Sequence, residues 1–283
     1  MKFRLKPITA FAFAVLVLVL ALILAFSLAF CDGDGENESN SETKERQDDG
    51  YMTTILDYTY KTDISAYADA LNTTDGEYLI LANKTYLVGE DFVPENLVVL
   101  DTQYTNGGKE IKLADYTAQA VTALILEMRA HGIDDVSVTS GYRDYEYQMS
   151  LYNRYFNNEK EKHPTWSDEQ IKAEVLTYSA YPGTSEHQTG LCVDLITSEM
   201  EGLWNFGSET PNNPYDKGFA ETDAFEWLKD NAHKFGFVLR YPEDKTDITG
   251  YAYESWHYRF VGIDAATEIY NSGLTLEEYL RKE

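Results

Sequence analysis

Apolar residues recur along this chain with two different periods, and each period predicts a different element. From residue 113 to residue 130 they fall three and four positions apart, as on one face of a helix, and Gly132 stands where a helix-ending glycine is common. Residues 136–139 alternate apolar and polar side chains, which is typical of a half-buried strand. Continuous apolar runs at 78–82 and 97–100 indicate strands or core segments.

The C-terminal half of the chain adds clear start and stop signals. Ser167 followed by Gln170 is a capping-box pattern at a helix start, and Asp223 with Glu226 predicts a second one, in a helix that Gly236 closes. Strands are predicted at 191–196, 237–241 and 255–261, and short helices at 264–270 and 274–280. Because helices and strands are interspersed without a regular βαβ period, the pattern favours the α+β class.

The first 31 residues form a segment of a different kind. Three basic residues precede 23 uncharged, mostly apolar residues at 8–30. A helix of that length rises about 35 Å, enough to cross a bilayer, and the basic flank places the following chain outside the cell. Cys31 follows a stretch similar to a bacterial lipoprotein cleavage site, with Phe30 where a small residue is expected. Residues 1–31 are therefore an uncleaved signal anchor or a lipoprotein signal with a lipid-modified Cys31, and both tether the protein to the outer face of the membrane.

Composition separates a linker from a domain. Residues 32–52 carry eight acidic against two basic residues and almost no aliphatic core former, which predicts a disordered, solvated linker. Residues 53–283 are long enough for one domain with a substantial core. The formal net charge of −25 argues against a nucleic-acid partner, because phosphate binding needs the opposite sign. Cys192 is the only cysteine after Cys31, so no disulfide is expected in the domain.

A histidine and an acid share the stretch TSEHQTGLCVDL, residues 184–195. Asp194 lies in an apolar run, and a buried carboxylate needs a partner, which can be a proton, an arginine or a metal ion. Among the five histidines, His187 and His257 have polar companions nearby in the sequence. The other three are expected near solvent, with structural or incidental roles: His131, His163 and His233.

Two sets of residues can together form one metal site. Zinc in hydrolases commonly takes three protein ligands and leaves the fourth position for water. His187, Asp194 and His257 would supply the ligands. Glu254, outside the ligand set, would act as general base. The alternative is an ordinary hydrogen-bonded His–Asp pair without metal, because the two sets lie about sixty residues apart and the spacing alone does not bring them together.

Three segments carry a resemblance to a known family. SGYRDYEYQ, YPGTSEHQTGLCVDL and ESWHYRFVG closely resemble the motifs of VanY-type D-alanyl-D-alanine carboxypeptidases, zinc metallopeptidases related to VanX-type dipeptidases and L,D-carboxypeptidases. YLILANKTYLVGEDFVPENLVVL resembles the family's N-terminal segment, so the likeness covers about residues 75–280. It implies a metallopeptidase catalytic domain at 53–283, with an antiparallel sheet flanked by helices and a zinc site in a cleft, as in hedgehog-like and D,D-peptidase folds.

The resemblance also implies roles for individual residues. One zinc ion per chain would be held by His187, Asp194 and His257, with Glu254 as the base. Arg143 would bind the terminal carboxylate of the substrate, a task that suits the two parallel donors of a guanidinium group. Four further positions match residues that line the family's substrate pocket, with ordinary packing or capping as the alternative for each: Gln148, Ser185, Tyr241 and Trp256.

One position departs from the family pattern. Cys192 stands where the family usually has a small residue. On an extended strand Cys192 shares a face with Asp194, two residues further on, so its thiolate could compete as a zinc ligand. The alternative is that Cys192 packs as a small buried side chain.

The implied activity is removal of the C-terminal D-Ala from peptidoglycan stem peptides. An L,D-carboxypeptidase acting on the tetrapeptide is the second reading. A non-catalytic module that binds stem peptides is the third, and it is disfavoured because all three ligands and Glu254 are present.

Overall fold

The computed structural model describes residues 58–198 and 218–281, and their architecture is built on a four-stranded antiparallel sheet. The strands, in spatial order, are β3 (Ser137–Ser140), β4 (Cys192–Ile196), β6 (His257–Phe260) and β5 (Phe237–Leu239). A separate antiparallel pair consists of β1 (Leu97–Val99) and β2 (Lys112–Ala114). The predicted tether at 1–31 and linker at 32–52 lie outside the described residues. Across 58–198 and 218–281, no helix has both the length and the apolarity to cross a membrane.

Pairing of the two central strands brings distant parts of the sequence together. β4 and β6 are antiparallel, with Asp194 directly opposite His257 and Cys192 opposite Arg259. Because side chains alternate across a strand, these four residues project from the same face of the sheet. The intervening residues of both strands belong to the main hydrophobic core, so one face of the sheet packs and the other carries chemistry.

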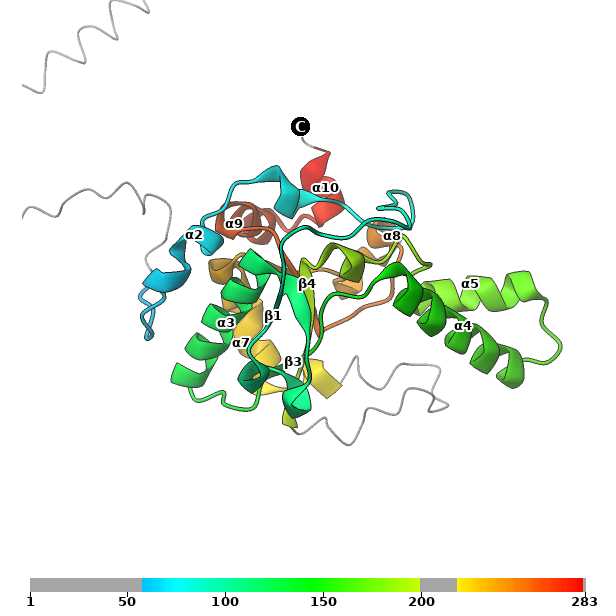
Figure 1. Ribbon diagram of the computed structural model, residues 1–283, viewed down its shortest axis with the longest axis horizontal. Coiled ribbons are helices and arrows are strands. Elements are labelled where there is room, and N and C mark those ends of the chain that lie inside the picture. Colours follow the sequence, from blue (N-terminus) through cyan, green and yellow to red (C-terminus); the bar gives the residue numbers. More distant parts are fainter. Residues whose placement is uncertain (1–57, 199–217, 282–283) are drawn as a thin grey trace, which may run out of the picture. The chain divides into compact units, whose positions relative to one another are not determined.

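Helices cover the packed face of the sheet. α3 (Asp115–Ala130) buries an apolar stripe that includes Ala120, Leu124 and Met128, with no exposed side-chain area at these three positions. Figure 1 shows α3 and α7 (Asp223–Asn231) together on one side of the sheet. α9 (Ile263–Ser272) contacts β5, and the described part of the chain also contains the short helices α2 (Ala68–Leu71), α8 (Thr246–Thr249) and α10 (Leu276–Leu280). The predicted α+β class, an antiparallel sheet flanked by helices, is confirmed.

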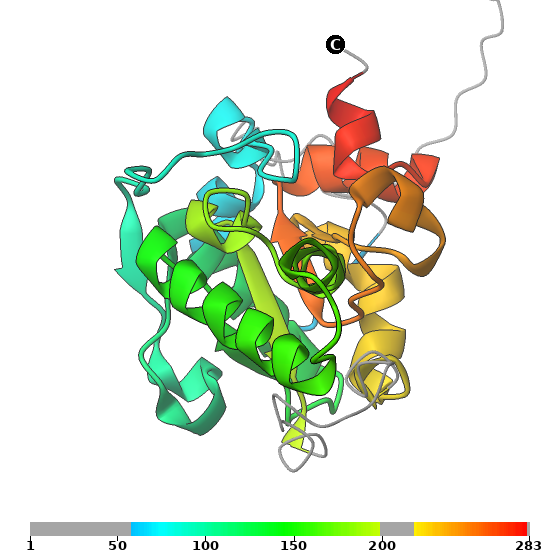
Figure 2. The same ribbon diagram turned by 90° about the vertical axis from the view of Figure 1, so that its right-hand side faces the viewer.

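A helical hairpin lies on the other side of the sheet, and its first helix was not predicted. α4 (Tyr145–Lys162) begins after Asp144, whose side chain accepts a hydrogen bond from the backbone N–H of Tyr147. α5 (Asp168–Tyr178) has the predicted capping box of Ser167 and Gln170. The two helices pack on each other around a small apolar cluster of their own and project from the sheet, as the two views show (Figures 1 and 2).

Three local predictions need correction. The segment 78–82 is not a strand: residues 76–79 form a 3-10 turn, although Tyr78 and Ala82 are buried in keeping with the core alternative. The helix predicted from residue 113 begins at Asp115, because the preceding residues pair with β1. The second predicted capping box is replaced by Thr222, whose hydroxyl caps α7 one residue earlier by accepting from the N–H of Phe225.

Candidate metal centre

His187 is carried by a short 3-10 turn, Glu186–Thr189, that precedes β4. Gly190 ends this turn with a positive φ of 70°. A Cβ added there would lie 3.0 Å from the backbone nitrogen of Ala114, so glycine allows the turn to pack directly against β2. The buried turn therefore has little freedom, and it fixes where His187 points.

A backbone carbonyl holds one ring nitrogen of His187. Its Nδ1 lies 2.6 Å from the carbonyl oxygen of Gly141, which accepts the ring N–H. Gly141 reaches this position only without a side chain, because a Cβ would meet the carbonyl oxygen of Lys112 at 2.7 Å. Because Nδ1 donates to this carbonyl, Nε2 is the ring nitrogen that faces Asp194 and becomes available to a metal ion when it loses its proton.

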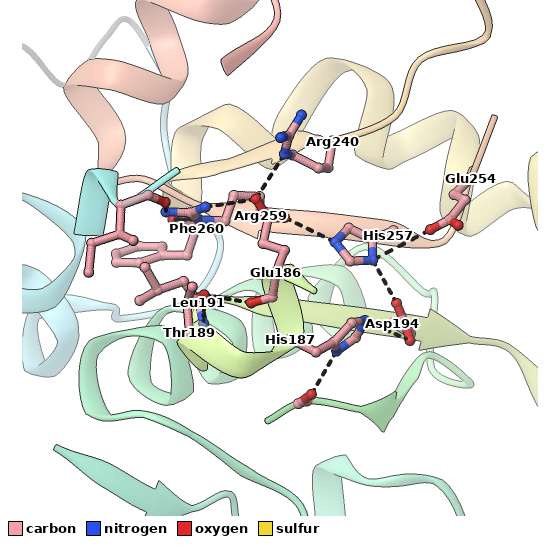
Figure 3. A network of polar contacts seen from close by, with 12 residues as sticks. Glu186, His187, Thr189, Leu191, Asp194, Arg240, Glu254, His257, Arg259 and Phe260 are labelled. Carbon is pink, nitrogen blue, oxygen red and sulfur yellow. Dashed lines mark hydrogen bonds and ion pairs between the residues drawn. The ribbon is translucent and has the colours of Figure 1, made fainter. Parts of the chain in front are cut away.

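Asp194 lies between the two predicted histidine ligands (Figure 3). Its Oδ2 is 3.3 Å from His187 Nε2, and its Oδ1 is 3.0 Å from His257 Nδ1. Arg143 also donates to Oδ2 at 2.8 Å. The buried acid thus has an arginine and two imidazoles around it, and the three predicted ligands, far apart in sequence, meet at one point.

Neighbouring charges, rather than burial, decide the protonation of this cluster. Burial raises the pKa of Asp194, but His187 and Arg143 outweigh it and hold the pKa well below the ordinary value. Burial and Arg143 lower the pKa of His187, but Asp194 raises it to about 9. The carboxylate of Asp194 is therefore ionised at neutral pH. When a metal ion binds to the metal-free protein, it has to displace protons from the imidazoles.

Glu254 lies beside His257 without joining the tight cluster. Its Oε2 is 3.6 Å from His257 Nδ1, and its side chain is 16% exposed. The backbone N–H of Glu254 donates to the carbonyl of Tyr241 at 3.1 Å, which joins the segment before β6 to the segment that follows β5. A carboxylate in this place can reach both the ligand cluster and water, as a general base requires.

The predicted pocket residues surround the cluster to different extents. Arg143 follows β3, and its Nε donates to the Ser140 hydroxyl at 3.0 Å. The Tyr241 ring centroid is 4.9 Å from that of His257. Gln148 is buried in α4 and donates to the carbonyl of Ala180. Ser185 is buried just before the 3-10 turn, and Trp256 is half-buried against the main core. Their roles toward substrate stay predictions.

Cys192 is close enough to the histidines to be compared with Asp194 as a ligand. Single donor atoms of His187, Cys192 and His257 all lie within 4.8 Å of one another. The resemblance to the family favours Asp194 over Cys192 as the third ligand, and the two oxygens of Asp194 lie 3.0 Å from His257 Nδ1 and 3.3 Å from His187 Nε2. Two imidazole nitrogens and one carboxylate oxygen are a donor set that suits zinc and leaves a fourth position for water.

Sequence reasoning missed two neighbours of the site. Glu186 is completely buried behind His257, and its Oε2 lies 3.1 Å from His257 Nε2. Tyr155 of α4 lies near Arg143 and Glu254; burial raises the pKa of its hydroxyl, and the charge of Arg143 opposes that rise. An acid directly before the ligand in the SEH motif was the only local signal for Glu186, and nothing local pointed to Tyr155.

The remaining histidines have other partners. His131 lies 3.3 Å from Glu127, and His163 stacks on Trp166. The prediction that His233 lies near solvent is wrong, because it is buried and stacks on Tyr270 with ring centroids 3.9 Å apart.

Comparisons with known proteins place this site in a family. The family described as VanY, D-alanyl-D-alanine carboxypeptidase, matches residues 110–263. A D-alanyl-D-alanine carboxypeptidase of Enterococcus faecalis is 39% identical over 72% of this chain; the match spans 66% of that relative, just under two thirds of its length.

Two solved structures are similar to this chain over most of their own length. A mutant of the vancomycin resistance D,D-pentapeptidase VanY in complex with Zn(II) is 35% identical, with a TM-score of 0.56 over 72% of this chain and 99% of that one. The LdcB LD-carboxypeptidase is 33% identical, with a TM-score of 0.58 over 75% and 89%. The predicted resemblance is confirmed: the chain belongs to the VanY family of D-alanyl-D-alanine carboxypeptidases.

Proposed function

We propose that the protein is a zinc-dependent D-alanyl-D-alanine carboxypeptidase that trims the C-terminal D-Ala from peptidoglycan stem peptides. The observation that carries the proposal is the meeting of His187, Asp194 and His257, with Glu254 at 3.6 Å from the last. The Zn(II) complex of a VanY structure that is 35% identical supports the metal, and the E. faecalis relative supports the activity.

The side chains divide the work of hydrolysis. A zinc ion bound by the three ligands would polarise the scissile carbonyl and lower the pKa of a bound water. Glu254 would take a proton from the attacking water at a carboxylate oxygen and deliver it to the leaving amine. Asp194, kept ionised by its neighbours, supplies negative charge to the cation site. No side chain has to form a covalent intermediate with the substrate.

Arg143 is the residue that would make the enzyme a carboxypeptidase. It is a partly exposed cation beside the ligand cluster, with 21% of its side chain exposed, and its contacts with Ser140 and Asp194 hold the guanidinium in place. A fixed guanidinium recognises a terminal carboxylate through two parallel donors. An internal peptide bond, which has no carboxylate next to it, would bind without this contact.

An L,D-carboxypeptidase is the second candidate, because the structure of the LdcB LD-carboxypeptidase matches this chain with a TM-score of 0.58. We favour the D,D activity since the matched family and the E. faecalis relative both carry that description.

We also propose that the domain acts on the outer side of the membrane, held there by residues 1–31. What supports this is the uncharged stretch at 8–30 behind three basic residues, together with the acidic linker at 32–52.

Synthetic muropeptides test these proposals together. The full-length chain, purified in detergent, is incubated with a pentapeptide ending in D-Ala-D-Ala and with a tetrapeptide ending in one D-Ala, with and without a zinc chelator. We expect mass spectrometry to show loss of one D-Ala from the pentapeptide only, no loss with chelator, and poor cleavage when the terminal carboxylate is an amide. Washed intact cells that express the protein should cleave the same peptide.

Each failure of this assay has its own meaning. Cleavage of the tetrapeptide alone would replace the D,D assignment by L,D. Full cleavage of the amide would remove the role of Arg143. Activity that persists after complete removal of metal would contradict a zinc mechanism, and activity seen only after cell lysis would contradict the outward-facing domain.

A further inference from the structure

Four charged side chains form a buried cluster directly behind His257 (Figure 3 shows three of them). They are Glu186, Arg240, Arg259 and Glu277, and none of the four is more than 2% exposed. Glu186 lies in the 3-10 turn, Arg240 directly follows β5, Arg259 lies in β6 and Glu277 in α10. Two acids and two arginines balance in charge, as a fully buried set requires.

Glu186 links this cluster to the metal site through its two oxygens. Oε1 accepts from Arg240 Nε at 2.8 Å and from Arg259 Nη1 at 2.7 Å. Oε2 faces His257 Nε2 at 3.1 Å. Both oxygens are therefore engaged, and Glu186 meets the imidazole edge opposite to the one that contacts Asp194.

The arginines are themselves fixed, so the carboxylate cannot turn freely. Arg240 makes a two-pronged contact with Glu277 of α10, at 2.9 and 2.6 Å. Arg259 donates to the backbone carbonyls of residues 78, 80 and 260. Since these guanidinium groups bind Oε1 as charged donors, Oε2 is held as an acceptor at a constant place.

We propose that Glu186 is a positioning residue of the metal centre, which fixes His257 as an Nδ1 ligand. A carboxylate can only accept, so it binds the imidazole tautomer that carries its proton on Nε2. That tautomer leaves the lone pair of Nδ1 pointing at Asp194 and Glu254, where the cation is expected. The inference rests on the proposed zinc site, and it adds a residue that neither binds the metal nor touches the substrate.

The carbonyl of Gly141 does the corresponding task for His187 by accepting from Nδ1. The two ligands would then bind through different nitrogens, His187 through Nε2 and His257 through Nδ1. Because Glu186 also precedes His187 in the chain, one short turn sets the geometry of two ligands at once.

The substitution Glu186→Gln tests the proposal with little change in volume. The amide oxygen should turn toward the two arginines, which need an acceptor, and the amide N–H₂ would then face His257 Nε2. A donor at that place stabilises the opposite tautomer, with a proton on Nδ1, and blocks the ligand atom. We expect zinc affinity, measured by competition with a chelator in the absence of peptide, to fall about 10- to 100-fold.

Glu277→Gln is the matched control. It removes the same charge from the same buried cluster, but the residue contacts Arg240 and Asn83 rather than His257. Both variants should lose thermal stability, whereas only Glu186→Gln should lose zinc affinity. Equal affinity losses in the two variants, or none in either, would overturn the positioning role. A wild-type chain that binds no zinc would instead overturn the proposed function.

Histidine tautomers in the wild-type protein give a second measurement that needs no variant to fold. Nitrogen NMR of the zinc-loaded, histidine-labelled chain reports which ring nitrogen is protonated and which binds metal, and the chain has only five histidines. We expect a protonated Nε2 and a metal-bound Nδ1 for His257, and the reverse for His187. A metal-bound Nε2 in His257 would contradict the proposal.

Discussion

Glu254→Ala is expected to lower kcat for a D-Ala-D-Ala substrate by about 10²- to 10⁴-fold, the usual contribution of a positioned general base, while zinc stays bound. The reason is geometric: Glu254 is 3.6 Å from His257 Nδ1, near the ligand cluster but outside the contacts that join Asp194 to both imidazoles. Steady-state kinetics with metal analysis of the same sample measures both quantities. KM should change much less than kcat, because the proton transfer occurs in the transition state.

Glu243→Ala is a suitable control for this result, since Glu243 is an exposed acid eleven residues earlier in the chain, in the 3-10 turn Glu243–Lys245. It should keep wild-type kcat and zinc content. If Glu254→Ala kept wild-type turnover, the base would have to be another group. If instead it lost its zinc, Glu254 would belong to the ligand set.

Asp194→Ala is expected to have the largest effect on the structure of the site. It removes the carboxylate that accepts from Arg143 at 2.8 Å and contacts both ligand imidazoles. Zinc content should fall to background and activity with it. Chelator-treated protein should also be destabilised by about 3–5 kcal/mol, because breaking a buried charge pair leaves the opposite charges without compensation. Urea unfolding of chelator-treated wild type and variant measures this difference.

Asp168→Ala separates this effect from the loss of any acid. Asp168 pairs with Lys160 at 2.7 Å, but its side chain is 64% exposed. Exposed pairs contribute about 0–1 kcal/mol, so this variant should unfold near the wild-type midpoint and keep its zinc. An Asp194→Ala variant that bound zinc as tightly as wild type would show that Cys192 or another group is the third ligand.

The strands that carry the ligands could be predicted because their apolar runs are local. β4 and β6 appeared as runs at 191–196 and 255–261, close to their observed bounds. The apolar runs do not show which strand pairs with which. The antiparallel register that sets Asp194 opposite His257 joins segments about sixty residues apart, and only the family resemblance linked them in advance.

The missed helix α4 has a different cause. It contains few aliphatic residues, and its buried positions include Gln148, Tyr152 and Glu159, so no apolar stripe announces it. Its burial depends on α5, which packs against it around Ile171 and Val175. Local signals were present, with Asp144 as a cap and two lysines in the last turn, but tertiary packing supplies most of the stability of such a helix.

The buried charges behind His257 could not be read from the sequence either. Glu186 lies between Ser185 and His187, whereas its partners Arg240, His257 and Arg259 lie 54 to 73 residues further along the chain. Arg240 in turn pairs with Glu277 of α10. Charged residues on predicted strands are ordinarily assigned to solvent-facing positions. Only the folded structure shows that Glu186, Arg240, Arg259 and Glu277 neutralise one another in the interior.

Diffraction at the zinc absorption edge from crystals of the zinc-loaded protein tests the central claim most directly. We predict one anomalous peak per chain, about 2.0–2.2 Å from His187 Nε2, His257 Nδ1 and an oxygen of Asp194, with Glu254 outside bonding distance. A peak elsewhere, or none between these three side chains at full zinc loading, would contradict the account.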